Sequence, residues 1–132
     1  MCLATRELLH GNAFFTDEVV YRLRDRAPRS VLDALYRAPR IHRGELPLAV
    51  DAVETDAVRC MEIAFWAALH ERSLEGAMRF LVDAGGDTAG NTSTAGGLLG
   101  ARDGEAAIPQ VWLATGDAAG LGVLAERLIA AG

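Results

Sequence analysis

The chain has 132 residues, a net charge of −5 and a pI near 5.1. This length allows one domain or part of one, and a hydrophobic content of 51% excludes general disorder. The negative charge argues against nucleic acid as a partner. Alanine is the most frequent residue and the strongest helix former, so the composition favours an all-α fold.

Neither a membrane span nor a signal peptide is visible in the sequence. No apolar stretch approaches the roughly 20 residues that cross a bilayer, and no charged region followed by an apolar run opens the chain. Cys2 and Cys60 have no metal-ligand spacing with the three histidines. We therefore expect a protein of the reducing cytoplasm, with no membrane partner.

The first part of the chain predicts three short helices. The first, over 3–10, ends at a Gly-Asn pair typical of a helix C-terminus. The second, over 16–26, begins with Thr16 as the N-cap and two acidic residues in the first turn. The third covers 30–37 and is ended by Pro39, because the residue before a proline disfavours helix. A loop is expected over 39–48.

All 13 basic residues are arginine, and several of them gather between residues 22 and 43. This segment suits either a solvated helix face or a phosphate-binding patch. Tyr36 is the one aromatic residue near its centre, so the stacking surface of a single-strand binding protein is missing. We favour the solvated face.

The second part predicts longer helices. Apolar residues repeat at spacings of three and four within a helix that starts at 50 or 55 and ends at 69, namely Val58, Met61, Phe65, Ala68 and Leu69. Ile63 and Trp66 lie off that face, so this helix needs neighbours on more than one side. Ser73 is expected to cap a helix over 74–82, Asp87 one over 88–102, and Gly116-Asp117 one over 118–131. With a short segment after Ile108-Pro109, seven or eight helices and no strand are expected.

The segment 85–101 carries the strongest functional signal. Gly85 and Gly86 permit a tight turn before a helix, and Asp87 follows as its N-cap. Hydroxyl and amide groups crowd the first turns at Thr88, Asn91, Thr92 and Ser93. A carboxylate among hydroxyls suits Mg²⁺ or Mn²⁺, and a helix N-terminus suits an anion. The alternative is a well-capped helix whose Gly96, Gly97 and Gly100 let another helix approach closely.

Several ordered motifs resemble the C-terminal signature of the ADP-ribosylglycohydrolase family. That family has a Gly-Gly-Asp-Thr-Asp-Thr run opening a helix, then Ala-Gly-x-Leu-x-Gly-Ala and Ile-Pro-x-x-Trp; here the matching segments are 85–90, 95–101 and 108–112. Upstream, 64–67 and 73–77 look like the family's Ala-Leu-Trp-Ala and Ser-Phe-Glu-Glu-Ala helices. The resemblance is clearest over 54–115 and vague over 1–50.

The resemblance implies an all-α, multi-helix orthogonal bundle that binds two divalent cations, Mg²⁺ or Mn²⁺. These cations hold the ribose of ADP-ribose and help to hydrolyse its glycosidic bond to a protein side chain or related leaving group. The resemblance implies a metal-ligand role for Asp87 and substrate binding, of ADP-ribose or an ADP-ribosylated protein, at Gly85, Gly86, Thr88 and Asn91. No residue is assigned a catalytic role.

Two departures from the family pattern bear on activity. Ala89 and Gly90 stand where the family has its second Asp and its Thr ligand, and neither offers a ligand side chain. The family's Thr-Asp-Asp motif does not occur, and the family domain is more than twice as long. We therefore expect 1–132 to be a single partial, truncated domain, lacking the N-terminal half, with impaired or absent hydrolysis. The alternative is a non-catalytic helical binding or interaction module derived from the family.

A partial domain also predicts exposed apolar faces. The faces of the helices predicted over 55–69 and 88–102 that the missing half would cover must be exposed or covered by something else. Large exposed apolar patches mark interaction surfaces. We therefore expect self-association or a partner chain that supplies the missing half.

Overall fold

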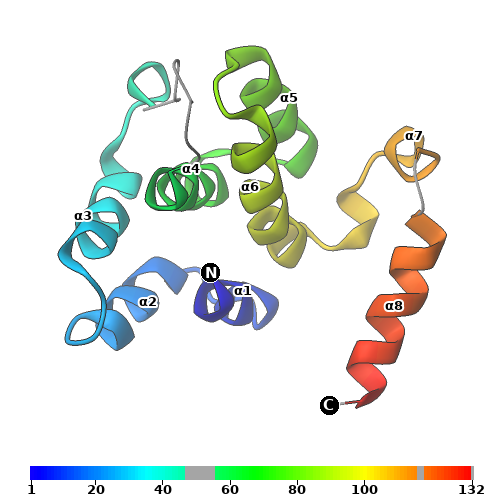
Figure 1. The fold of residues 1–132 in the computed structure, drawn as a ribbon, viewed down its shortest axis with the longest axis horizontal. Helices are drawn as coiled ribbons and strands as arrows, with labels where there is room; N and C mark the ends of the chain where they lie inside the picture. The colour runs from blue at the N-terminus through cyan, green and yellow to red at the C-terminus, as the bar shows by residue number, and fades with distance from the viewer. Residues whose placement is uncertain (47–55, 116–117, 132) are drawn as a thin grey trace.

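The computed structural model describes residues 1–46, 56–115 and 118–131. Within these ranges the chain is helical, with no strand (Figure 1). The α-helices are α1 (Cys2–Leu9), α2 (Phe15–Leu23), α3 (Arg29–Arg37), α4 (Ala57–His70), α5 (Leu74–Ala84), α6 (Thr88–Asp103), α7 (Gln110–Leu113) and α8 (Ala118–Ala131). The all-α prediction is confirmed.

Helix α4 lies at the centre of the fold. Figure 1 shows it end-on, while α5 and α6 run in the plane of the view, so α4 crosses them steeply as in an orthogonal bundle. Its largest contact is with α6, and α3 packs against it as well. Helices α1 and α2 close the lower side of the same core, where α1 also contacts α6.

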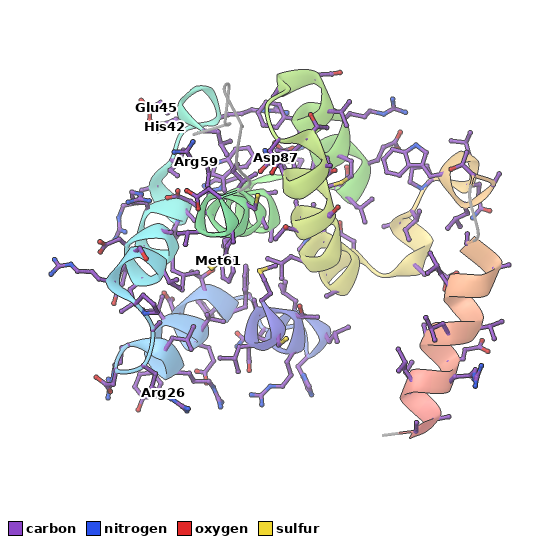
Figure 2. The ribbon with its side chains drawn as sticks, viewed as in Figure 1. Arg26, His42, Glu45, Arg59, Met61 and Asp87 are labelled. Atoms are coloured by element: carbon purple, nitrogen blue, oxygen red, sulfur yellow. The ribbon has the colours of Figure 1, made fainter. Side chains whose placement is uncertain are left out.

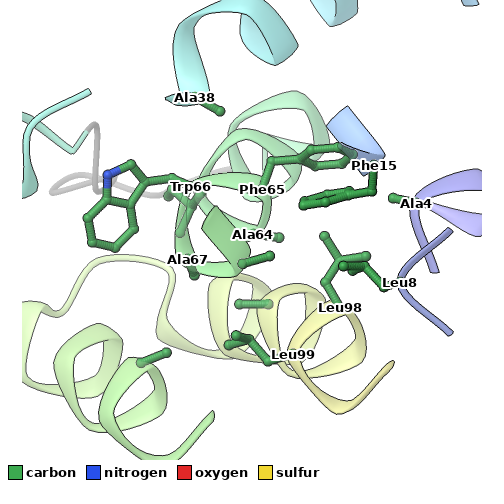
Figure 3. Close-up of a cluster of buried hydrophobic side chains, with 14 of the residues drawn as sticks. Ala4, Leu8, Phe15, Ala38, Ala64, Phe65, Trp66, Ala67, Leu98 and Leu99 are labelled. Carbon is green, nitrogen blue, oxygen red and sulfur yellow. The ribbon is translucent and has the colours of Figure 1, made fainter. Parts of the chain in front are cut away.

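The core forms around the aromatic residues of α4 (Figure 3). Phe65 and Trp66 are fully buried, and the Phe65 ring stacks on Phe15 with centroids 5.4 Å apart. Leu98 and Leu99 of α6 complete the cluster. The expected neighbours on several sides of α4 are therefore present.

The predicted apolar stripe on α4 is partly wrong. Val58 and Met61 are half-buried and Leu69 is exposed, whereas Ile63 and Trp66, placed off the stripe, are buried. The reason is that partner helices cover α4 on several sides, so no single face is the buried one.

Helix starts follow the local capping signals with one exception. Ser73 Oγ accepts a hydrogen bond from Gly76 N at 3.1 Å, which confirms the predicted cap of α5. Thr16 does not cap α2, because that helix begins at Phe15 and Thr16 is buried in its first turn. Packing of Phe15 on Phe65 outweighs the capping preference of a threonine.

The connections differ from the sequence prediction in detail. The expected loop contains two 3₁₀ turns, η1 (Ala38–Arg40) and η2 (Arg43–Glu45), and a third, η3 (Glu105–Ala107), follows α6. The remainder of that loop, the start predicted for α4 at 50–55 and the Gly116-Asp117 cap lie outside the described residues.

A clamp from the end of α6 holds the turn between α4 and α5. Arg102 Nη1 donates to the carbonyls of Ala68 and Glu71, each at 2.8 Å. Asp103 Oδ2 accepts from the backbone N–H of Leu74 at 3.0 Å and also pairs with Arg102. The last turn of α6 therefore satisfies polar groups at the end of α4 and the start of α5.

The expected close approach at the glycines of α6 is found at one position. A Cβ on Gly96 would lie 3.8 Å from Met78 Sδ of α5, an ordinary contact. Around Gly97 and Gly100 no atom lies within 4 Å of such a Cβ. The prediction is thus wrong for these two glycines, which face open space.

Exposed apolar side chains gather on α8 rather than on α4 and α6. The exposed fractions of Leu121, Leu124, Leu128 and Ile129 are 67%, 51%, 67% and 81%. Helix α8 stands beside the main body in Figure 1 and has no buried residue. Of the two alternatives expected for α4 and α6, exposure or cover by other parts of the chain, the structure shows the second, since α1, α3 and α5 pack around them. No helix in the described ranges is long and apolar enough to span a membrane.

Candidate functional site

The candidate site is the turn that leads from α5 into α6. Gly85 and Gly86 adopt φ values of 75° and 72°, in the left-handed region that glycine enters without strain. The backbone N–H of Gly85 closes α5 by donating to Val82, and that of Thr88 donates to the Gly86 carbonyl at 2.8 Å. The two glycines are therefore required to bring Asp87 to the start of α6.

Both carboxylate oxygens of Asp87 have partners inside the chain. Oδ1 accepts a hydrogen bond from Gly90 N at 3.0 Å, which confirms Asp87 as the N-cap of α6. Oδ2 accepts from the thiol of Cys60 on α4, with Sγ 3.8 Å away. Figure 2 shows Asp87 at this end of α6, beside α4. The carboxylate thus links the two central helices.

The Cys60 thiol is held in its protonated form. Burial, followed by the charge and hydrogen bond of Asp87 and the charge of Asp56, raises the pKa of this thiol above its ordinary value. A thiolate is the reactive form of cysteine. Cys60 therefore acts as a hydrogen-bond donor in the core.

The geometry of Asp87 depends on the absence of a side chain at position 90. A Cβ on Gly90 would lie 2.3 Å from Asp87 Oδ2 and 2.9 Å from Cγ, closer than real Cβ contacts. A β-branched threonine at this position would displace the carboxylate. Gly90 therefore allows Asp87 to fold back onto its own helix.

The hydroxyl groups of the first turns also bond within α6. Thr92 Oγ1 donates to the Thr88 carbonyl at 2.6 Å, and Thr94 Oγ1 donates to the Gly90 carbonyl at 2.8 Å. Thr88 itself is half-buried, with Oγ1 3.5 Å from the Gly86 carbonyl. The hydroxyls of Thr92 and Thr94 therefore donate to backbone carbonyls of α6.

Asn91 lies inside the protein, one turn after Asp87. It is 1% exposed, and its Nδ2 finds no hydrogen-bond partner in the described part of the chain. Gly85, Gly86 and Thr88 lie at or near the surface of the turn. The structure thus groups the four predicted substrate residues around Asp87, with Asn91 on the inner side.

A cavity of about 320 Å³ adjoins the start of α4. One wall is a partly buried ion pair, in which Arg37 of α3 donates to both carboxylate oxygens of Glu62 at 2.7 and 3.2 Å. Glu62 is 3% exposed, and its hydrogen bond raises the pKa of the Arg37 guanidinium. The pair is not evident in the sequence, because its members lie 25 residues apart on different helices.

Most arginines of the basic segment are also paired. Arg22, Arg24 and Arg29 form ion pairs with nearby acids on their own helix or turn. Arg43 pairs with Glu71 across the fold. The pairs of Arg22, Arg24 and Arg29 support the solvated-face interpretation for the helical part of this segment.

Comparison with known families gives one finding. A sequence model described as ADP-ribosylglycohydrolase matches residues 1–132. The chain belongs to the ADP-ribosylglycohydrolase family. The match includes 1–50, where the motifs gave a vague likeness. No curated protein and no solved structure matches the chain.

The described residues of this ADP-ribosylglycohydrolase-family chain offer no complete ligand set for the cations that its family uses. No group of three or more His, Cys, Asp or Glu side chains able to share an ion occurs within the described ranges. Asp87 Oδ1 bonds to Gly90 N, and its other oxygen meets a thiol, which is a poor ligand for Mg²⁺. Asp56 caps α4 through the amides of Val58 and Arg59. We derive no reaction step through a metal here.

Proposed function

We propose that the chain is an ADP-ribosylglycohydrolase-like protein in which hydrolysis is impaired and the α5–α6 turn retains a binding role. Its substrate class is ADP-ribose or an ADP-ribosylated protein. Family membership supports the class. The observation that supports impaired hydrolysis is the Asp87 carboxylate, which accepts a hydrogen bond from Gly90 N of its own helix. The nearby Ala89 and Gly90 have no side chain that could bind a metal ion.

A non-catalytic helical binding module is the second candidate. It is favoured by the hydrogen bonds at the start of α6. There Asp87, Thr92 and Thr94 all bond to groups of the protein itself. In such a module the exposed surface of Gly85, Gly86 and Thr88 contacts the ligand.

A thermal-shift titration separates the two. ADP-ribose is added with and without Mg²⁺ or Mn²⁺, and Tm is compared for wild type and Asp87→Ala. Impaired glycohydrolase chemistry predicts stabilisation that needs the metal and is lost in D87A. The binding module predicts stabilisation that is independent of the metal. No shift at millimolar ADP-ribose would refute both.

The variant needs a stability correction. D87A removes the cap of α6 and is expected to lower stability by about 1 kcal/mol without any ligand. Ser73→Ala removes the equivalent cap of α5 at 3.1 Å and serves as the matched control. An increase in Tm on adding ADP-ribose indicates binding at Asp87 only if it is lost in D87A and kept in S73A.

Domain organisation, partners and location complete the proposal. We infer that residues 1–132 form one partial family domain, the C-terminal portion, which associates with a partner chain or a second copy. The exposed apolar side chains of α8 support this association. The free thiols of Cys2 and Cys60 support a cytoplasmic location.

A further inference from the structure

A second cavity lies at the opposite end of α4 from Asp87. Its volume is about 500 Å³, within the range of roughly 300–1,000 Å³ typical of small-molecule sites. Residues from η2, the last turn of α4 and the first turn of α5 line it. Because α4 has 14 residues, its two ends are about 20 Å apart. The cavity is therefore separate from the candidate site.

Positive side chains dominate this cavity. Arg43, His70 and Arg72 line it, and Glu71 is the one carboxylate among its described lining residues. Glu71 already has a cation beside it, since its Oε1 lies 3.4 Å from Arg43 Nη2. Arg72 has no ion pair or hydrogen bond within the described part of the chain. The cavity thus carries an excess of positive charge and one guanidinium free to bind.

Arg43 and His70 are held in place by aromatic neighbours. The Arg43 guanidinium lies over the Phe80 ring, 4.2 Å from its centroid. The His70 ring stacks on Trp66, with centroids 5.4 Å apart, and its Nδ1 lies 3.0 Å from the Trp66 carbonyl. A carbonyl only accepts, so Nδ1 is the donor in this contact.

The wall behind these side chains is rigid and partly apolar. Trp66 Nε1 donates to the Ile41 carbonyl at 2.9 Å, which ties the η1–η2 connection to α4. Arg102 holds the α4–α5 turn through the Glu71 carbonyl. Ile41 and Trp66 add apolar surface to the lining.

We propose that this cavity binds the phosphate group of a small phosphorylated molecule. Guanidinium groups match phosphate oxygens in geometry and charge, and hydrogen bonds between charged groups are the strong ones. Arg72 supplies a free guanidinium group, and Arg43, which also pairs with Glu71, adds a second one in the same lining. The organic part of the ligand packs on Ile41. This site is independent of the ADP-ribose site proposed above.

Titration by NMR tests the proposal. ¹⁵N-labelled protein is titrated with inorganic phosphate at constant ionic strength, and backbone amide and His70 imidazole signals are followed. Saturable shifts are expected over residues 70–76. Arg72→Gln should weaken the affinity about tenfold, as expected for the loss of one charged hydrogen bond.

Arg79→Gln is the matched control, because Arg79 lies on α5 in an ion pair with Glu75 and does not line the cavity. It should leave the affinity unchanged. Equal weakening by R72Q and R79Q, or shifts spread over the arginines of α2 and α3, would show diffuse charge screening and overturn the proposal. So would the absence of a saturable shift.

Phenyl phosphate tests the organic part of the ligand. It should bind more tightly than inorganic phosphate, since its ring can contact Ile41. Equal affinities would overturn the proposal of a phosphorylated organic molecule and leave free phosphate as the ligand. Neither result depends on whether ADP-ribose binds at α6.

Discussion

The cap of α6 depends on a missing side chain, and this dependence predicts a measurable coupling. In Gly90→Ala the new Cβ would stand 2.3 Å from Asp87 Oδ2, so the carboxylate must turn away. It then loses the hydrogen bond from Gly90 N at 3.0 Å and the contact with Cys60. Loss of an N-cap side chain costs about 1 kcal/mol.

The same substitution also has a favourable part. Alanine in a helix is more stable than glycine by up to about 1 kcal/mol. At Gly97 nothing lies within 4 Å of the added Cβ, so Gly97→Ala should raise the free energy of unfolding by about 1 kcal/mol. At Gly90 the two effects oppose each other, and the expected change is near zero.

A double-mutant cycle isolates the coupling. Urea unfolding followed by far-UV circular dichroism gives the free energy of unfolding for G90A, D87A and the double variant. With Asp87 removed, G90A has nothing to displace and should stabilise the chain; the coupling energy is then about 1 kcal/mol. G97A should have the same effect in both backgrounds. If G90A stabilises wild type as much as it stabilises D87A, the argument about Asp87 is wrong.

Two further predictions concern buried groups. Arg37→Met leaves Glu62, which is 3% exposed, without its partner. The free energy of unfolding should fall by about 3 kcal/mol. This is the low end for breaking a buried pair, because the Arg37 side chain is 59% exposed. An unchanged urea midpoint would contradict this. The raised pKa of Cys60 means that the unfolded thiol ionises at lower pH than the folded one, so stability should fall as the pH rises above the ordinary value of 9.0. Cys60→Ala should flatten this decline, and an identical pH profile in that variant would refute it.

The sequence predicted those features that depend on neighbours in the chain. The caps at Ser73 and Asp87 were predictable, because a cap bonds to amides three residues away. The start of α2 was not, since Phe15 is drawn into the helix by its contact with Phe65 of α4. The buried faces of α4 likewise depend on which helices surround it.

The candidate site shows the same division. The turn at Gly85-Gly86 and the position of Asp87 followed from local preferences. The thiol of Cys60, 27 residues away, and the Arg37–Glu62 pair, 25 residues apart, could not be predicted from spacing. Such contacts arise only when α4 packs between α3 and α6.

The clamp formed by Arg102 and Asp103 bears on how the protein opens. The end of α4 and the start of α5 share their polar partners with the last turn of α6. If one of these three helix ends frays alone, polar groups at the other ends lose their hydrogen-bond partners. Residues 68–74 and the end of α6 therefore form one cooperative opening unit, whose amides exchange with solvent together.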